Sequence, residues 1–123
     1  MYDSDNMFAK ILRGEIPCDE VYSDDEVLAF RDITPAAPVH ILVVPRDEYI
    51  SFDDFVCKAG REDLTHFFTG VQQVAEQEGL VEGGYRLITN HGPDASQSVP
   101  HFHVHILGGR PLGGLVPGDV QER

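Results

Sequence analysis

Residues 97–109 read Gln97-Ser98-Val99-Pro100-His101-Phe102-His103-Val104-His105-Ile106-Leu107-Gly108-Gly109. Histidines stand at every second position from His101 to His105, and the residues between and after them are apolar. An alternation of period two is typical of a β-strand that turns one face toward the core. We therefore expect a strand that presents Phe102, Val104 and Ile106 to the core and a row of imidazoles on its other face.

The imidazole row is a candidate functional site, because each ring needs partners for two nitrogens and loses its charge readily when buried. Scattered, half-exposed strand histidines are the alternative, although perturbable groups collect at functional sites. Two histidines at i and i+2 can chelate one Zn²⁺. Same-face neighbours lie about 6.6 Å apart along a strand, so one ion cannot easily reach all three rings. A hydrolytic metal site usually also contains a carboxylate or a cysteine, and only Asp94 is near in the sequence.

Nucleophilic catalysis at phosphorus fits the row better than metal binding does. The middle imidazole, that of His103, would attack, while its neighbours orient it and handle charge and protons. A row of rings suits this chemistry, because a phosphoryl group and its leaving atom are spread in space. On this interpretation we assign no metal ligands and expect no cofactor to be required.

The stretch resembles the signature of the histidine triad (HIT) superfamily, in which three histidines alternate with apolar residues. The apolar positions of that signature are here Phe102, Val104, Ile106 and Leu107. The flanking residues 97–99 and 108–109 are most similar to the Hint branch, the histidine triad nucleotide-binding proteins. The resemblance covers roughly residues 6–112. It implies an α+β fold in one domain over residues 1–123, with an antiparallel sheet of about five strands, one long helix and short helices packed on it.

Composition agrees with one small domain. The chain has 123 residues, 41% of them hydrophobic, and a net charge of −12, which argues against nucleic acid or an anionic membrane as a partner. No apolar run approaches the ~20 residues of a membrane span, and the acidic N-terminus does not resemble a signal peptide. Cys18 and Cys57 are far apart in the sequence. A bridge between them stays open, but free thiols in a cytoplasmic protein are the expectation.

Periodicity and turn residues predict the remaining elements. A helix is expected over residues 4–13, with Ser4 as its N-cap and Gly14 at its end. The longest helix carries His66 on its polar face, where we expect the ring to be solvated. The other expected elements are strands at 20–23, 27–31, 36–45 and 84–90, a short helix at 51–55 and the long helix at 61–78.

The resemblance implies a purine pocket and a ribose site. The family positions that line the pocket match Phe8, Ile11 and Ile16, which on their own would be ordinary core residues. Asp32 follows a strand and would by statistics form a turn. The resemblance instead implies that Asp32 holds both ribose hydroxyls, which a carboxylate can accept together, and that Ile33 lies against the base.

Four further residues take roles from the resemblance. The segment Pro38-Val39-His40 matches the family's Pro-x-His, which implies that His40 is a fourth catalytic histidine. Alone, it would more often be a satisfied core residue. Asn90 would bond the phosphate or the histidine cluster, and Gln97 and Ser98 would donate to phosphate oxygens.

The implied function is that of a nucleotide-binding hydrolase or nucleotidyl transferase acting at the α-phosphorus of purine nucleotides, above all on adenosine 5′-phosphoramidates. His103 would form a covalent nucleotidyl intermediate and His105 would protonate the leaving amine, with His101 and His40 supporting position and charge. The family also implies a homodimer whose sheets meet edge to edge, and a purine nucleoside monophosphate as ligand.

Two alternatives stay open. One is a dinucleoside polyphosphate hydrolase of the same superfamily, and the other is a non-enzymatic nucleotide- or metal-binding module. The chain departs from the family pattern in three places: the tail over residues 113–123 has no tryptophan, Ser96 stands where members often carry glycine, and His91 stands where a glutamate or aspartate is expected.

Overall fold

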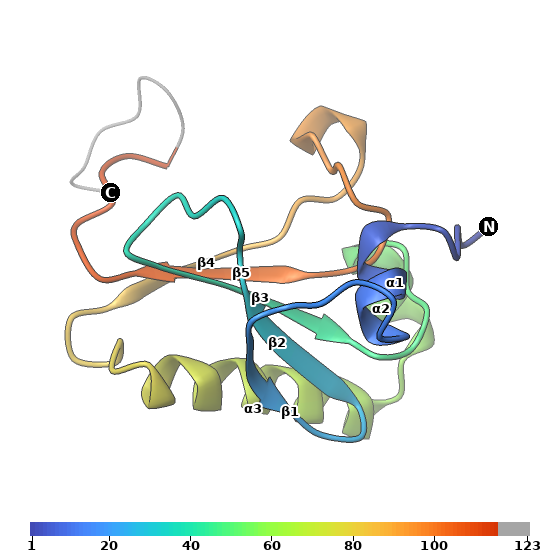
Figure 1. Ribbon diagram of the computed structural model, residues 1–123, viewed down its shortest axis with the longest axis horizontal. Coiled ribbons are helices and arrows are strands. Elements are labelled where there is room, and N and C mark those ends of the chain that lie inside the picture. The colour runs from blue at the N-terminus through green and yellow to red at the C-terminus, as the bar shows by residue number, and fades with distance from the viewer. Residues whose placement is uncertain (116–123) are drawn as a thin grey trace.

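The computed structural model describes residues 1–115, which fold around one five-stranded antiparallel sheet with strand order β1-β2-β3-β5-β4 (Figure 1). The sheet and its helices confirm the predicted α+β architecture. The strands are β1 (Glu20–Ser23), β2 (Val27–Arg31), β3 (Val39–Pro45), β4 (Tyr85–Ile88) and β5 (Val104–Gly108). The helices are α1 (Met7–Leu12), α2 (Phe52–Lys58) and α3 (Arg61–Gln77), with a 3₁₀ turn, η1 (Pro93–Ala95).

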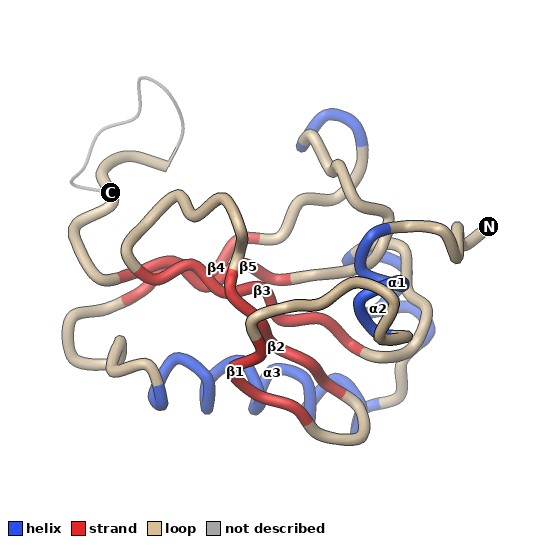
Figure 2. Tube along the Cα trace, viewed as in Figure 1, coloured by secondary structure: helices blue, strands red, loops and turns tan. Residues whose placement is uncertain are grey.

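Strand pairing sorts side chains onto the two faces of the sheet. Ile41 pairs with Ile106, and Leu42 pairs with His105, and residues directly opposite each other share a face. The first pair belongs to the core cluster that includes residues of α3, and Leu42 belongs to the cluster that includes Phe8 of α1. Figure 2 shows α3 running along one side of the strands, while α1 lies near one end of the sheet.

The α3 side holds the larger core. Phe102 stacks on Phe55 with ring centroids 4.6 Å apart and also contacts Phe67 at 5.3 Å. These three rings are 1% exposed, so the residue between two of the motif histidines is held firmly in the core. Val104 and Ile106 join the same cluster, which confirms the predicted inward face of the motif.

Strand β3 is buried on both faces, which explains its nearly continuous apolar run. Val39–Pro45 contains five consecutive buried apolar or proline positions after His40, which is itself buried.

The strand predicted from His101 begins only at Val104. In the register of β3 and β5, Val43 faces Val104, so Pro45 would come opposite Phe102. A proline has no N–H to give to a ladder. The N–H of Phe102 donates instead to the carbonyl of Tyr49, 2.7 Å away. The prediction of one strand carrying all three histidines is therefore wrong for His101 and His103, which precede β5.

Helix α1 begins later than predicted and has another cap. Asn6, not Ser4, is the N-cap, and its Oδ1 accepts from the N–H of Ala9 at 2.9 Å. Asparagine and serine cap helices about equally well, and here the N–H of Asn6 also bonds the carbonyl of Asp3, so the chain turns before the helix. Gly14, with φ of +78°, follows the helix as expected.

His66 lies on the exposed face of α3, as predicted, and it also has acidic partners that the sequence did not indicate. Its Nε2 lies 2.7 Å from Asp24 Oδ2 and 3.6 Å from Glu26 Oε2, which ties α3 to the turn between β1 and β2. The hydrogen bond to Asp24 raises the pKa of His66 above its ordinary value.

The tail begins against the sheet. Arg86 on β4 donates to the carbonyl of Gly113 at 2.8 Å. Most of the divergent tail predicted for residues 113–123 lies outside the described residues. Within residues 1–115, none of the helices combines the length and apolar character that crossing a bilayer requires.

Candidate functional site

A cavity of about 410 Å³ opens on the α1 side of the sheet. Its walls come from α1, the segment after it, the end of β2 and the loop that leads into β5, and His103 and His105 lie at its surface. Seven of the predicted nucleotide-binding residues line it: Phe8, Ile11, Ile16, Asp32, Ile33, Asn90 and Ser98. The fold thus brings together positions from four separate parts of the chain.

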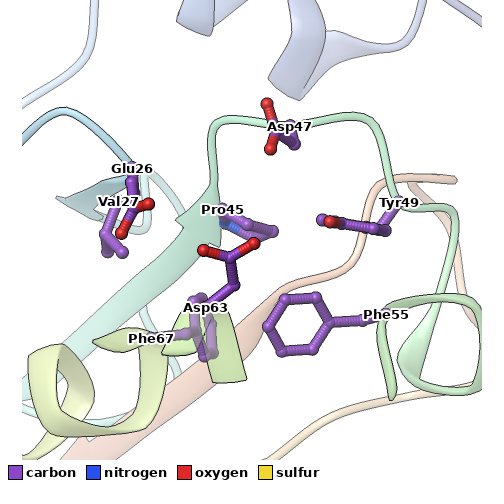
Figure 3. Close-up of a pocket in the computed structure, with 8 residues that line it drawn as sticks. All are labelled: Glu26, Val27, Pro45, Asp47, Tyr49, Phe55, Asp63 and Phe67. Atoms are coloured by element: carbon purple, nitrogen blue, oxygen red, sulfur yellow. The ribbon is translucent and has the colours of Figure 1, made fainter. Parts of the chain in front are cut away.

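A second cavity, near Pro45, is too small to be the site. It measures about 20 Å³, room for about one water molecule. Figure 3 shows Glu26 and Val27 on one side of it and Tyr49 and Phe55 on the other.

His103 presents a free ring nitrogen. Its Nδ1 lies 2.7 Å from the backbone carbonyl of His101, and because a carbonyl only accepts, Nδ1 carries the hydrogen. In the neutral ring Nε2 then holds a lone pair. The ring is 6% exposed and meets the edge of Phe8, with centroids 4.8 Å apart at 90°. This tautomer leaves Nε2 available to attack an electrophile.

His105 has the opposite arrangement, because its Nδ1 meets another histidine. The N–H of Ala36 donates to Nδ1 of His40 at 3.0 Å, so the hydrogen of a neutral His40 is on Nε2. That Nε2 donates to Nδ1 of His105 at 2.9 Å. The hydrogen of His105 is consequently on its own Nε2. Two neighbouring histidines therefore differ: His103 can attack, and His105 can donate.

Burial keeps these rings neutral. It lowers the pKa of His101 to about 4 and that of His103 below its ordinary value. Burial, together with the neighbouring rings of His103 and His40, lowers the pKa of His105 to about 4. At neutral pH the three motif histidines are uncharged, as a row of buried imidazoles was expected to be.

His101 does not stand in the open row where the alternation predicts it. It is completely buried and does not line the cavity. Its Nε2 lies 2.8 Å from the carbonyl of Pro45, and its Nδ1 lies 2.6 Å from the hydroxyl of Tyr2. His40, from the neighbouring strand, contacts His105 behind the cavity surface, and it does not line the cavity either.

Gln97 also differs from expectation. Its amide nitrogen donates to the carbonyls of Ile50 at 2.7 Å and Val99 at 3.1 Å, and its oxygen accepts from the N–H of Gly92 at 2.9 Å. Both amide hydrogens are thus used to hold the loop, and Gln97 does not line the cavity. Ser96 in the same loop has φ of +59°, the left-handed conformation that glycine would adopt more readily.

Sequence reasoning missed several residues of the site. Thr89 donates to the backbone carbonyl of His103 at 2.7 Å, and Tyr2 bonds His101. Arg31 lines the cavity and pairs with Glu78 at 2.9 Å. No spacing in the sequence signals these contacts, because each depends on tertiary packing. Cys18 also lines the cavity, and both cysteines are free thiols.

One group of side chains could hold a metal ion. Ligand atoms of Asp32, His40 and His105 all lie within 4.8 Å of one another, and Asp32 Oδ2 is 3.4 Å from His40 Nε2. Two histidines and a carboxylate are a zinc ligand set. The search for a carboxylate beside the motif overlooked Asp32, since strand pairing, not sequence distance, brings it near.

Known proteins agree with this architecture. A purine nucleoside phosphoramidase of Escherichia coli K12 is 47% identical over 112 residues, which cover 91% of this chain and 93% of the relative. A 14 kDa zinc-binding protein of Zea mays is 46% identical over 115 residues, covering 89% of this chain and 86% of the relative. A solved histidine triad protein from Clostridium difficile superimposes with a TM-score of 0.82 at 40% identity, covering 94% of this chain and all of that one.

The HIT domain family itself matches residues 13–112. That range contains His40, His101, His103 and His105 and the part of the cavity lining that follows α1. From its sequence and its structure, this chain belongs to the HIT domain family.

Proposed function

We propose that this chain hydrolyses purine nucleoside phosphoramidates, with adenosine 5′-phosphoramidates as the preferred test substrates. The observation that carries the proposal is the opposite proton placement on His103 and His105 beside a cavity of about 410 Å³. Pockets for small ligands have this order of size. The similarity to the bacterial purine nucleoside phosphoramidase supports the same reaction class.

The apolar part of the cavity suits a purine base. Phe8, Ile11 and Ile16 line it, and Ile33 is 89% exposed at its margin. An exposed isoleucine gains contact area when a flat ring covers it.

Asp32 suits the ribose. Its Oδ1 accepts the N–H of Thr34 at 2.8 Å, which fixes the carboxylate at the cavity wall. A carboxylate held in this way can accept hydrogen bonds from two neighbouring hydroxyls.

The proposed chemistry has two displacements at phosphorus. Nε2 of His103 attacks and forms a bond to phosphorus as the bond to the leaving amine breaks. The leaving amine is protonated through Nε2–H of His105, which relays a proton taken up from solvent when the substrate binds, because a neutral imidazole is too weak an acid to give up its only N–H. Water then displaces the imidazole and releases the nucleoside monophosphate, and the proton of the water returns to solvent by the same route. Hydrogen bonds from Ser98 and Asn90 would stabilise charge on the phosphoryl oxygens. No step requires a metal ion or cofactor.

The first test is a search for the covalent intermediate. Purified protein is mixed with adenosine 5′-phosphoramidate, quenched early and digested, and mass spectrometry looks for added AMP on the peptide that contains His103. His103→Ala should abolish turnover and still bind AMP, because the ring attacks phosphorus whereas other groups hold the nucleotide. His66→Ala is the matched control and should keep turnover.

Turnover by His103→Ala would refute the proposed nucleophile. If the wild-type protein does not hydrolyse phosphoramidates but does hydrolyse dinucleoside polyphosphates, the alternative function of a dinucleoside polyphosphate hydrolase is favoured.

The pH dependence follows from burial. Attack needs a neutral His103, and burial lowers its pKa below the ordinary value. The site therefore keeps its reactive protonation state at lower pH than a solvent-exposed histidine would. We expect the acid limb of kcat/KM to be centred below the ordinary histidine pKa of about 6.5. An acid limb centred near 6.5 would contradict this expectation.

The free energy of unfolding, measured over the same pH range, is the control for the activity profile. The unfolded chain takes up protons at these histidines near pH 6.5, but folded His101 and His105 do so only near pH 4. The free energy of unfolding should therefore fall as the pH drops below about 6.5, by up to about 1.4 kcal/mol per pH unit for each such proton. Urea unfolding at each pH separates this loss from loss of activity.

Metal binding is a second candidate function, favoured by the cluster of Asp32, His40 and His105 and by the similarity to the plant zinc-binding protein. In this cluster Nε2 of His40 faces Nδ1 of His105 at 2.9 Å. A Zn²⁺ ion bound to both nitrogens would displace the hydrogen between them. We therefore propose that bound zinc and turnover exclude each other.

The expected result is inhibition by Zn²⁺ that chelation reverses, with binding measured by calorimetry. Asp32→Asn should weaken zinc binding at least about tenfold, because it removes the anionic ligand. Asp24→Asn, a change of the same kind far from the cavity, should not alter it. Metal analysis of untagged protein then separates the two functions: stoichiometric zinc without hydrolytic activity would favour the binding module.

We also propose that the chain forms a homodimer through β4. This strand ends the sheet order, so its outer edge has no neighbouring strand within the described residues, and open edges favour pairing with another chain. Leu87 and Ile88 on it are 45% and 37% exposed, and Phe52 and Phe68 beside them are each 40% exposed. These side chains surround a shallow cavity of about 120 Å³, an apolar surface of the kind that a second copy can cover.

Light scattering after size exclusion tests the dimer. Leu87→Asp should shift the protein from dimer to monomer, because a carboxylate would lose its water in the interface. Val81→Asp changes an exposed apolar residue outside that cavity lining and should leave the dimer intact. A wild-type protein that is monomeric at micromolar concentration would refute this assignment.

A further inference from the structure

Tyr2 reaches the first histidine of the motif across 99 positions of sequence. Its hydroxyl lies 2.6 Å from Nδ1 of His101, and the two rings meet edge to face with centroids 5.6 Å apart. The carbonyl of Pro45 accepts from the other ring nitrogen at 2.8 Å, so Nε2 carries the hydrogen and Nδ1 is the acceptor. The Tyr2 hydroxyl is therefore the donor that satisfies a nitrogen in a completely buried ring.

The backbone of His101 orients the attacking ring. Its carbonyl accepts the Nδ1 hydrogen of His103 at 2.7 Å, and this hydrogen bond leaves Nε2 of His103 free. The position of that carbonyl depends on the His101 side chain, which is held between Tyr2 on one side and Pro45 on the other. Loss of either partner leaves a buried polar nitrogen unsatisfied, which favours rearrangement of the ring.

The same N-terminal segment supports the opposite wall of the cavity. Residues 2–6, here called the N-terminal strap, lead directly into α1. Asn6 fixes their turn, with its side-chain amide donating to the carbonyl of Asp3 at 2.8 Å and its oxygen capping the helix. Arg13 donates to the carbonyl of Ser4 at 2.8 Å. Helix α1 then places Phe8 against the His103 ring.

We propose that Tyr2 is a positioning residue for His103 that acts through His101. Its hydroxyl fixes the His101 ring, the His101 carbonyl fixes the His103 ring, and the strap holds Phe8 against that ring. This inference rests on the proposed function for its kinetic consequence. Its structural consequence, the ordering of the His103 Nδ1–H group, is independent of any reaction.

The test removes one oxygen atom. Tyr2→Phe keeps the ring and deletes the hydroxyl. Tyr22→Phe is the matched control, because the Tyr22 hydroxyl also makes a 2.6 Å bond, to Asp24, remote from the cavity. Both variants are compared with wild type in thermal unfolding, steady-state kinetics with adenosine 5′-phosphoramidate and long-range ¹H–¹⁵N spectra of the histidine rings.

The expected result separates positioning from folding. Tyr2→Phe should lower kcat about tenfold, because small displacements of a nucleophile are costly, and should change KM less than twofold. The Nδ1 resonance of His101 should move to that of an unbonded acceptor nitrogen, and the Nδ1–H of His103 should exchange faster with solvent. Tyr22→Phe should leave kcat and both histidine signals at wild-type values.

Three results would overturn the proposal: wild-type kcat in folded Tyr2→Phe, an unmoved His101 Nδ1 resonance, or equal loss of kcat in the Tyr22→Phe control. If the wild-type protein does not hydrolyse phosphoramidates, the proposed function fails, and the spectra still decide the role of Tyr2. Faster exchange at His103 in Tyr2→Phe alone then supports it, and unchanged exchange refutes it.

Discussion

The antiparallel pairing of β3 with β5 is the constraint on which the rest of the site depends. Its register sets Leu42 opposite His105 and His40 opposite Leu107. The two histidines therefore lie diagonally on one face, with Nε2 of His40 2.9 Å from Nδ1 of His105. A shift of one residue would send His105 into the α3 core and Ile106 into the cavity. The apolar side chains of β5 oppose that shift, because their burial on the α3 side stabilises only the observed register.

Pro45 sets the other limit of this pairing. Because it cannot donate to a ladder, β5 has no strand partner before Val104. The residues before Val104 are consequently free to leave strand geometry. Their carbonyls and side chains make specific contacts there: the carbonyl of His101 fixes His103, and the ring of His101 bonds the carbonyl of Pro45 itself. The end of the ladder thus creates the place where the proposed nucleophile is oriented.

Local patterns predicted most of the fold. The hairpin strands at 20–23 and 27–31 and the long helix from residue 61 coincide with the observed elements, since their periodicity and turn residues agree with their tertiary surroundings. The errors occur where two local signals compete or where a distant residue decides. Ser4 and Asn6 were both suitable caps, and only the turn at Asp3 selects Asn6. His66 is exposed on a polar helix face as expected, but its partner, Asp24, is 42 positions away and could not be inferred from the helix pattern.

The candidate site could be predicted as a set of positions but not as a set of interactions. Seven of the residues that the resemblance names as nucleotide-binding line one cavity, whereas the alternation of the motif predicted that His101 would lie in one row with His103 and His105. The structure makes the three rings unequal through what each Nδ1 meets: a tyrosine hydroxyl, a backbone carbonyl and a second imidazole. An Nδ1 that faces a hydroxyl or an imidazole N–H accepts a hydrogen bond, whereas an Nδ1 that faces a carbonyl must carry the hydrogen and donate it. Chemically identical side chains at alternate positions can therefore differ in burial and in the ring nitrogen that carries the hydrogen, and these differences are set by packing that no spacing in the motif records.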